Sequence, residues 1–129
     1  MARIPLLLSL LAIATVAAAA EPAGQPTARV DLTFGNTVMS IYPDGRSQKI
    51  WLQPDGTWTG LSRRGNPLAG KWEVKGEKVC LRQSKPPTLP TSFCQTFPSD
   101  PMKGIDARDL TGTPIHLKLV KGHVEKAEG

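Results

Sequence analysis

The sequence predicts an all-β fold, a small antiparallel meander of about eight short strands that forms a barrel or a sandwich. Three observations support this prediction. Apolar residues alternate with polar ones at the period of two that a half-buried strand requires. Turn signals recur about every 8–12 residues, which is the spacing of hairpins in sandwiches and barrels. Twelve glycines and twelve prolines in 129 residues argue against a helical bundle or a coiled coil.

Residues 1–20 are typical of a secretory signal peptide. Arg3 gives a positive start, residues 4–16 are almost wholly apolar, and small residues with an Ala-x-Ala pattern end at Ala20. The apolar stretch is shorter than the roughly 20 residues that a membrane-spanning helix needs. We therefore expect a periplasmic or secreted protein with no stable membrane span after cleavage. An uncleaved N-terminal anchor is the alternative.

The first half of the remaining chain predicts a tail and four strands. Residues 21–28 contain two prolines, a glycine and no large apolar side chain, so we expect a mobile N-terminal tail. A β domain is expected over residues 29–120, and alternation predicts its first strand at 30–34. Three β-rich runs follow, at 37–42, 46–52 and 57–62. Pro-Asp-Gly turns at 43–45 and 54–56 separate these runs and indicate consecutive hairpins.

The second half predicts four further strands and a polar C-terminal tail over residues 121–129. The strands are expected at 70–75, 78–83, 92–97 and 115–119. Residues 84–91 are rich in proline and are therefore expected to be a loop, as are residues 98–106, with a turn at 109–113. Because the connections resemble simple hairpins, we favour a barrel over an open sandwich.

Cys80 and Cys94 are the two cysteines of the chain, and both follow the signal segment. An exported chain meets an oxidising compartment, so we predict one disulfide between them. The alternative is a redox pair, which usually has the spacing C-x-x-C and does not match this one. Strict alternation points both cysteines away from their apolar neighbours. The bond is then a staple on the outer face, unless a β-bulge turns both residues inward.

The residue types needed for catalysis or metal binding are present without a matching pattern. No G-x-S-x-G motif occurs, and His116 and His123 are the two imidazoles. Neither is expected in a sheltered site with a fixed partner, since one alternates to the solvent side and the other lies in the tail. Asp44 and Asp55 belong to turns rather than to a calcium loop. We expect a non-enzyme without metal or cofactor, with a hydrolase of unrecognised type as the enzymatic alternative.

Aromatic residues form a first candidate contact surface. Trp51, Trp58 and Trp72 fall on neighbouring strands of the predicted meander. Core filling and cross-strand pairing are the ordinary explanation for tryptophans at such positions. Trp51, however, alternates with Ile50 and Leu52, so one of these two faces must lie away from a single core. We therefore take the region of Trp51 and Trp58 as a candidate for an exposed aromatic contact.

Basic residues form a second candidate surface. Lys71, Lys75, Lys78 and Arg82 alternate with apolar residues on two strands joined by one tight turn, in a chain with a net charge of +5. An anionic envelope polymer or an acidic protein surface would complement such a face. A solvated charged surface is the alternative interpretation. Export argues against nucleic acid as the partner.

The segment Gly70-x-Trp72-x-Val74-x-Gly76-x-x-x-Cys80-Leu81, followed by Cys94, resembles small exported β-proteins of proteobacteria. It is similar, more distantly, to the bacterial inhibitors of secreted metalloproteases. Their small barrel carries a G-x-W segment, a cysteine on the next strand and one disulfide. In that family the G-x-W segment lies near the start of the domain, whereas here two Pro-Asp-Gly hairpins precede it. The inhibitor resemblance implies that residues 21–28 enter a protease cleft.

Together these features lead us to expect an exported, non-catalytic binding or interaction module of the cell envelope. Its partner would be an envelope protein or an anionic envelope polymer. A periplasmic protease inhibitor that acts through its N-terminal tail is the alternative.

Overall fold

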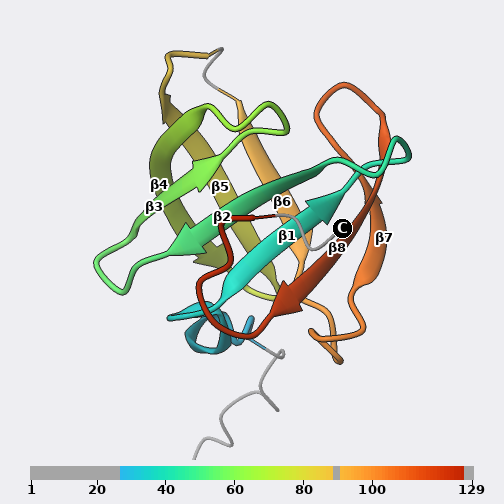
Figure 1. Ribbon diagram of the computed structural model, residues 1–129. Coiled ribbons are helices and arrows are strands. Elements are labelled where there is room, and N and C mark those ends of the chain that lie inside the picture. Colours follow the sequence, from blue (N-terminus) through green and yellow to red (C-terminus); the bar gives the residue numbers. More distant parts are fainter. Residues whose placement is uncertain (1–26, 89–90, 127–129) are drawn as a thin grey trace, which may run out of the picture.

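Eight antiparallel strands form one sheet that curls into a nearly closed barrel (Figure 1). The computed structural model describes residues 27–88 and 91–126. In chain order the strands are β1 (Thr37–Ile41), β2 (Ser47–Leu52), β3 (Thr57–Leu61), β4 (Pro67–Lys75), β5 (Lys78–Lys85), β6 (Ser92–Thr96), β7 (Ile105–Arg108) and β8 (Pro114–Val120). The predicted all-β fold is confirmed.

The strand order is that of an up-and-down meander with one unpaired junction. Neighbours in the sheet follow the order β6-β5-β4-β3-β2-β1-β8-β7. Each strand therefore pairs with the next one in the chain except at the step from β6 to β7, and the pairing of β1 with β8 closes the other side. The two edges of the sheet are thus β6 and β7.

The two Pro-Asp-Gly turns form the predicted hairpins β1–β2 and β2–β3. Gly45 and Gly56 have φ angles of 83° and 88°, a left-handed conformation that glycine adopts without steric cost. The carboxylates of Asp44 and Asp55 each accept a backbone N–H two residues further on, at 2.9 Å. Local turn chemistry therefore fixes these two hairpins without help from distant residues.

One predicted strand is wrong. Residues 30–34 do not alternate across a sheet, because Val30–Thr33 form a 3₁₀ turn, η1. The Thr33 hydroxyl donates to the Val30 carbonyl at 2.6 Å, so local hydrogen bonds replace a strand ladder. Val30 and Phe34 pack against the core, and η1 lies at the lower end of the barrel in Figure 1.

One strand lies where a loop was expected. The predicted loop over residues 98–106 is wrong at its end, because Ile105–Arg108 form β7 and pair with β8. Asp106 lies opposite His116, and their side chains are joined at 2.9 Å. The strand count thus agrees with the prediction although the set of strands differs.

The packed core lies toward β2, β3 and β4. Its buried cluster consists of Ile50, Leu52, Trp58 and Leu68. Gly70 makes room for the Trp58 indole, because a Cβ atom at this position would come within 2.7 Å of the ring. Two residues further on, Trp72 packs against Phe34 with ring centroids 5.8 Å apart. The G-x-W segment therefore has a packing role in this barrel.

Cys80 and Cys94 form the predicted disulfide. They lie directly opposite each other on β5 and β6. Leu81 and Phe93, which neighbour them, line the barrel interior, so the cysteines face outward. The bond is a staple on the outer face. The register shift of this region lies elsewhere: Ala69 and Gly70 of β4 pair with Lys85 and Gln83 of β5, which leaves Ser84 unpaired.

Candidate binding cavity

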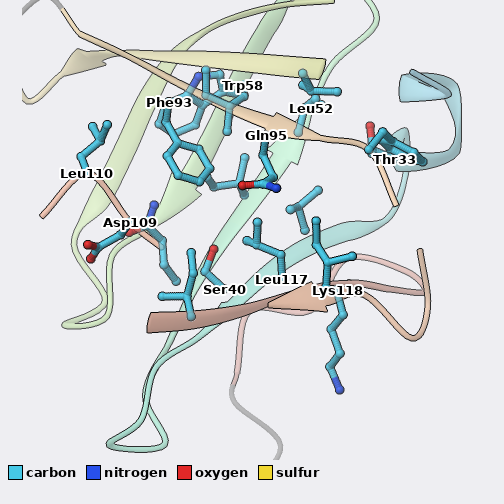
Figure 2. Close-up of a pocket in the computed structure, with 18 of the residues that line it drawn as sticks. Thr33, Ser40, Leu52, Trp58, Phe93, Gln95, Asp109, Leu110, Leu117 and Lys118 are labelled. Carbon is cyan, nitrogen blue, oxygen red and sulfur yellow. The ribbon is translucent and has the colours of Figure 1, made fainter. Parts of the chain in front are cut away.

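The barrel interior contains a cavity of about 630 Å³ (Figure 2). Its wall is mostly apolar and includes Val38, Ile50, Leu52, Val79, Leu81, Phe93 and Leu117. Alternation directs these side chains inward from five strands, namely β1, β2, β5, β6 and β8. Pockets for small-molecule ligands span roughly 300–1,000 Å³ and are lined by apolar groups with a few polar ones. The cavity has both the size and the lining of such a site.

Much of this apolar wall is not covered by other side chains. Six inward-facing residues are only half-buried, namely Val38, Val79, Leu81, Phe93, Ile105 and Leu117. Protein interiors are normally packed as densely as organic crystals, and apolar groups that face unfilled space lose contact energy. Five of the six lie on the edge strands β6 and β7 or on their neighbours β5 and β8, and Val38 is on β1. The interior is therefore accessible on the side of these edge strands.

Neutral polar groups also face the cavity. Ser40 and Gln95 project toward it in Figure 2, and Gln48 lines it as well. Within the described residues, these three side chains have no hydrogen-bond partner in the protein. A fourth, Gln83, donates to the Pro86 carbonyl at 2.9 Å. The free amide and hydroxyl groups are available to hydrogen-bond a ligand.

The sequence contained a signal for these polar groups. Gln48, Gln83 and Gln95 each occupy the same alternation phase as apolar residues of their strands, such as Ile50, Leu81 and Phe93. A glutamine in the core phase of three separate strands points to an interior that is not fully packed with side chains. The sequence prediction placed the contacts on outer surfaces and missed this interior set.

A buried tyrosine lines the cavity just beyond the end of β1. Tyr42 is 8% exposed, and its hydroxyl donates to Asp109 Oδ2 at 3.0 Å. The Arg63 guanidinium lies over the ring, 3.9 Å from its centroid. Asp109 in turn accepts the backbone N–H groups of Thr111 and Thr113, which orders this loop. Burial, followed by the hydrogen bond and charge of Asp109, raises the pKa of Tyr42 to about 12.

We expect the native protein to titrate its tyrosine at about pH 12, and the unfolded chain at about pH 10. Tyr42 is the single tyrosine, so phenolate absorbance reports it alone. Because the folded state keeps a proton that the unfolded state loses, the resulting stability is present below pH 10 and declines toward pH 12. Asp109→Asn should lower the native midpoint without restoring the ordinary value, since burial is the largest cause. A native midpoint near the ordinary value would contradict the buried geometry.

The two candidate tryptophans face opposite sides of the sheet. Trp58 points inward and lines the cavity (Figure 2), whereas Trp51 lies on the outer face. Trp51 is nonetheless only 7% exposed, which corrects the expectation of an exposed indole. Its Nε1–H donates to Thr37 Oγ1 at 2.9 Å, and the His123 ring stacks on it with centroids 4.0 Å apart. The C-terminal segment therefore covers Trp51.

The four basic candidates do come together on the outer face of β4 and β5. Lys71 lies opposite Arg82, and Lys75 lies opposite Lys78. All four are exposed, and Glu73 between them pairs with Lys75 at 3.2 Å. Like charges in directly opposed positions repel each other, which favours an anion at this surface. Its role in binding stays a prediction.

The histidines lie outside the cavity. His116 is on the outer face of β8, and the Asp106 carboxylate, followed by the Lys103 carbonyl, raises its pKa. Over residues 27–88 and 91–126, no group of three or more His, Cys, Asp and Glu side chains is placed to hold a metal ion. The same part of the chain contains no helix that is long and apolar enough to cross a membrane.

The N-terminal boundary of the domain is one residue earlier than expected. Ala28 is buried, and its N–H donates to the Gly76 carbonyl at 2.8 Å, so it belongs to the folded domain rather than to the tail. The predicted signal peptide over residues 1–20 and residues 21–26 of the predicted tail lie outside the described residues.

Comparison with known proteins gives no relative: the chain matches no family model, no curated protein and no solved structure. The resemblance to exported β-proteins and to metalloprotease inhibitors stays a prediction.

Proposed function

We propose that this chain is an exported, non-catalytic binding protein that holds a small, mostly apolar molecule inside its barrel. The observation that carries the proposal is the cavity of about 630 Å³ with its half-buried apolar wall. Each square ångström of apolar surface removed from water contributes about 25 cal/mol, so a ligand in contact with this wall gains affinity from burial. The signal segment supports export, and the disulfide is compatible with an oxidising compartment.

The polar groups of the wall favour a neutral ligand. Ser40, Gln48 and Gln95 offer hydroxyl and amide groups without charge. Of the charged residues that border the cavity, Asp109 is held by Tyr42 and its own loop, and Lys118 extends away from the cavity in Figure 2. A charged ligand group inside would lack a partner and would be costly to bury. We therefore infer a molecule with an apolar body and one or two neutral hydrogen-bonding groups, such as a long-chain alcohol or amide.

The test is binding of a neutral apolar fluorophore, N-phenylnaphthylamine, to the purified protein. We expect saturable fluorescence enhancement that a competing long-chain alcohol reverses. Leu117→Trp should weaken probe binding by about tenfold or more, because the larger side chain fills space that Leu117 borders in Figure 2. The experiment measures the dissociation constant by fluorescence titration.

The matched control is Thr59→Trp, which adds the same side chain at an exposed position on the outer face of β3. This variant should bind the probe as the unaltered protein does. Circular dichroism establishes that both variants fold. Fluorescence that does not saturate, or equal probe affinities for the two variants, would overturn the proposal.

A further inference from the structure

A second recess, of about 250 Å³, lies on the outer surface between the turns of two hairpins. One turn joins β1 to β2, and the other joins β3 to β4. Its lining includes Arg46, Ser47, Lys49, Ser62, Arg63 and Glu125. Three of these six side chains are cations and two are hydroxyls. The recess is separate from the barrel interior, because Lys49 points outward from β2 while Gln48 and Ile50 line the cavity.

Lys49 is the unusual member of this group. It is 6% exposed, although lysine is almost never fully buried without a paired charge. Its ammonium carries three N–H donors. Among the described residues it forms one hydrogen bond, to Ser47 Oγ at 3.3 Å. A buried cation without an anion is costly in free energy. Lys49 forms no ion pair within the described residues, so its ammonium keeps donors for a bound anion.

The neighbouring cations are also weakly neutralised. Arg63 stacks on Tyr42, and it forms no ion pair within the described part of the chain. The Arg46 Nε atom is 3.9 Å from Asp44, at the long limit of an ion pair. Glu125 lines the recess, but its Oε1 atom is bonded to His123 Nε2 at 3.1 Å. The recess thus keeps an excess of positive charge.

The walls of the recess are fixed in place. The C-terminal segment lies against the outer face of β1 and β2. Its Val124 N–H donates to Thr37 Oγ1 of β1 at 2.9 Å, and His123 stacks on Trp51 of β2. On the opposite wall, Ser62 Oγ accepts the N–H groups of Arg64 and Asn66 at 3.3 and 3.1 Å. These contacts leave the Ser62 hydroxyl proton free to donate. A bound ion would meet Lys49 and Ser62 in preorganised positions, and the exposed Arg46 and Arg63 would become ordered on binding.

We propose that this recess binds an oxyanion of the phosphate type, either free or as the terminal group of a larger molecule. Several cations and hydroxyls around one small space suit a compact anion with several oxygens and more than one charge. Hydrogen bonds between arginine or lysine and phosphate are charge-assisted and are about twice as strong as neutral ones. The inference does not depend on the ligand of the barrel interior.

The experiment is titration of the purified, disulfide-bonded protein with inorganic phosphate at constant ionic strength. We expect saturable binding and a melting temperature that rises with phosphate, because the ligand binds the folded state. Lys49→Met should abolish both effects, and Arg63→Gln should weaken binding about fivefold or more. Glu125→Gln should strengthen binding by removing a like charge. Arg64→Gln is the matched control, since this arginine is in the same turn and does not line the recess.

Two results would overturn the proposal: no saturable phosphate binding by the unaltered protein, or unchanged affinity in Lys49→Met. If Lys49→Met does not fold, Arg63→Gln and Arg64→Gln test the proposal instead, because both side chains are exposed and their replacement should not disturb folding. Equal phosphate affinities of these two variants would then overturn it. Sedimentation with phosphatidylcholine vesicles, with and without phosphatidic acid, identifies the source of the anion. Sedimentation that requires phosphatidic acid and Arg63 indicates a lipid headgroup, whereas response to inorganic phosphate alone indicates a soluble ligand.

Discussion

Trp58→Ala is expected to lower the free energy of unfolding by about 3–5 kcal/mol. Trp58 is 3% exposed and is the largest member of the buried cluster with Ile50, Leu52 and Leu68. Its Nε1–H also donates to the Lys71 carbonyl at 3.1 Å. Truncation removes both contributions and leaves a void next to Gly70, where the backbone is shaped around the indole. Urea unfolding followed by far-ultraviolet circular dichroism measures the loss.

Thr59→Ala is the control for this substitution. Thr59 is the next residue on β3 and is exposed on the outer face, so its truncation should change stability by no more than about 0.5 kcal/mol. Trp58→Phe should lie between the two, because it keeps an aromatic ring and loses the N–H donor. A loss below about 1 kcal/mol for Trp58→Ala would mean that this cluster is not the core of the barrel.

The parts of the fold that depend on local chemistry were predictable from the sequence. The hairpins around Gly45 and Gly56 follow from a three-residue turn motif that needs no distant contact. The segment at 30–34 shows the limit of alternation as a signal. Its apolar residues have the period of a strand, but the Thr33 hydroxyl bonds back to Val30 and favours a turn. A local pattern thus supports two structures, and side-chain hydrogen bonding decides between them.

Non-local contacts account for what the sequence did not show. β7 has only four residues, and no run of apolar residues in the sequence indicates it. It forms a strand because it pairs with β8. Trp51 is buried because His123, distant in the chain, stacks on it. The disulfide staple, in contrast, was one of two open alternatives, and the regular pairing of Cys80 with Cys94 decides between them. Alternation tells which face a side chain occupies, but not what covers that face.

For the candidate sites too, the sequence shows which face a side chain occupies but not what surrounds it. The wall of the cavity could be assigned to one face from alternation, including Phe93 and Gln95. That this face surrounds free space depends on barrel closure and on the volumes of all the inward side chains, which no single strand encodes. The outer recess is harder still, because Lys49 and Arg63 come from different hairpins and are brought together by sheet register. Sequence spacing alone contains no sign of their meeting.

Removal of the disulfide, by Cys80→Ala together with Cys94→Ala, is expected to lower the free energy of unfolding by about 3 kcal/mol. The bond closes a loop with a sequence separation of 14 residues, and its loss gives the unfolded chain more conformational freedom. It also joins β5 to β6, an edge strand that pairs on one side only. Urea unfolding measures the loss, and a larger dependence on urea is expected because the unfolded chain becomes more exposed.

The same variant tests whether β6 limits access to the cavity. Phe93 and Gln95 belong to this strand and line the interior, so a looser edge should speed both amide exchange in Ser92–Thr96 and release of N-phenylnaphthylamine. Chemical reduction of the unaltered protein is the control, and it should reproduce the stability of the double variant. If reduction and substitution both leave the free energy of unfolding unchanged, the staple does not stabilise the barrel. If stability falls but probe release does not change, β6 is not the moving wall and the ligand enters elsewhere.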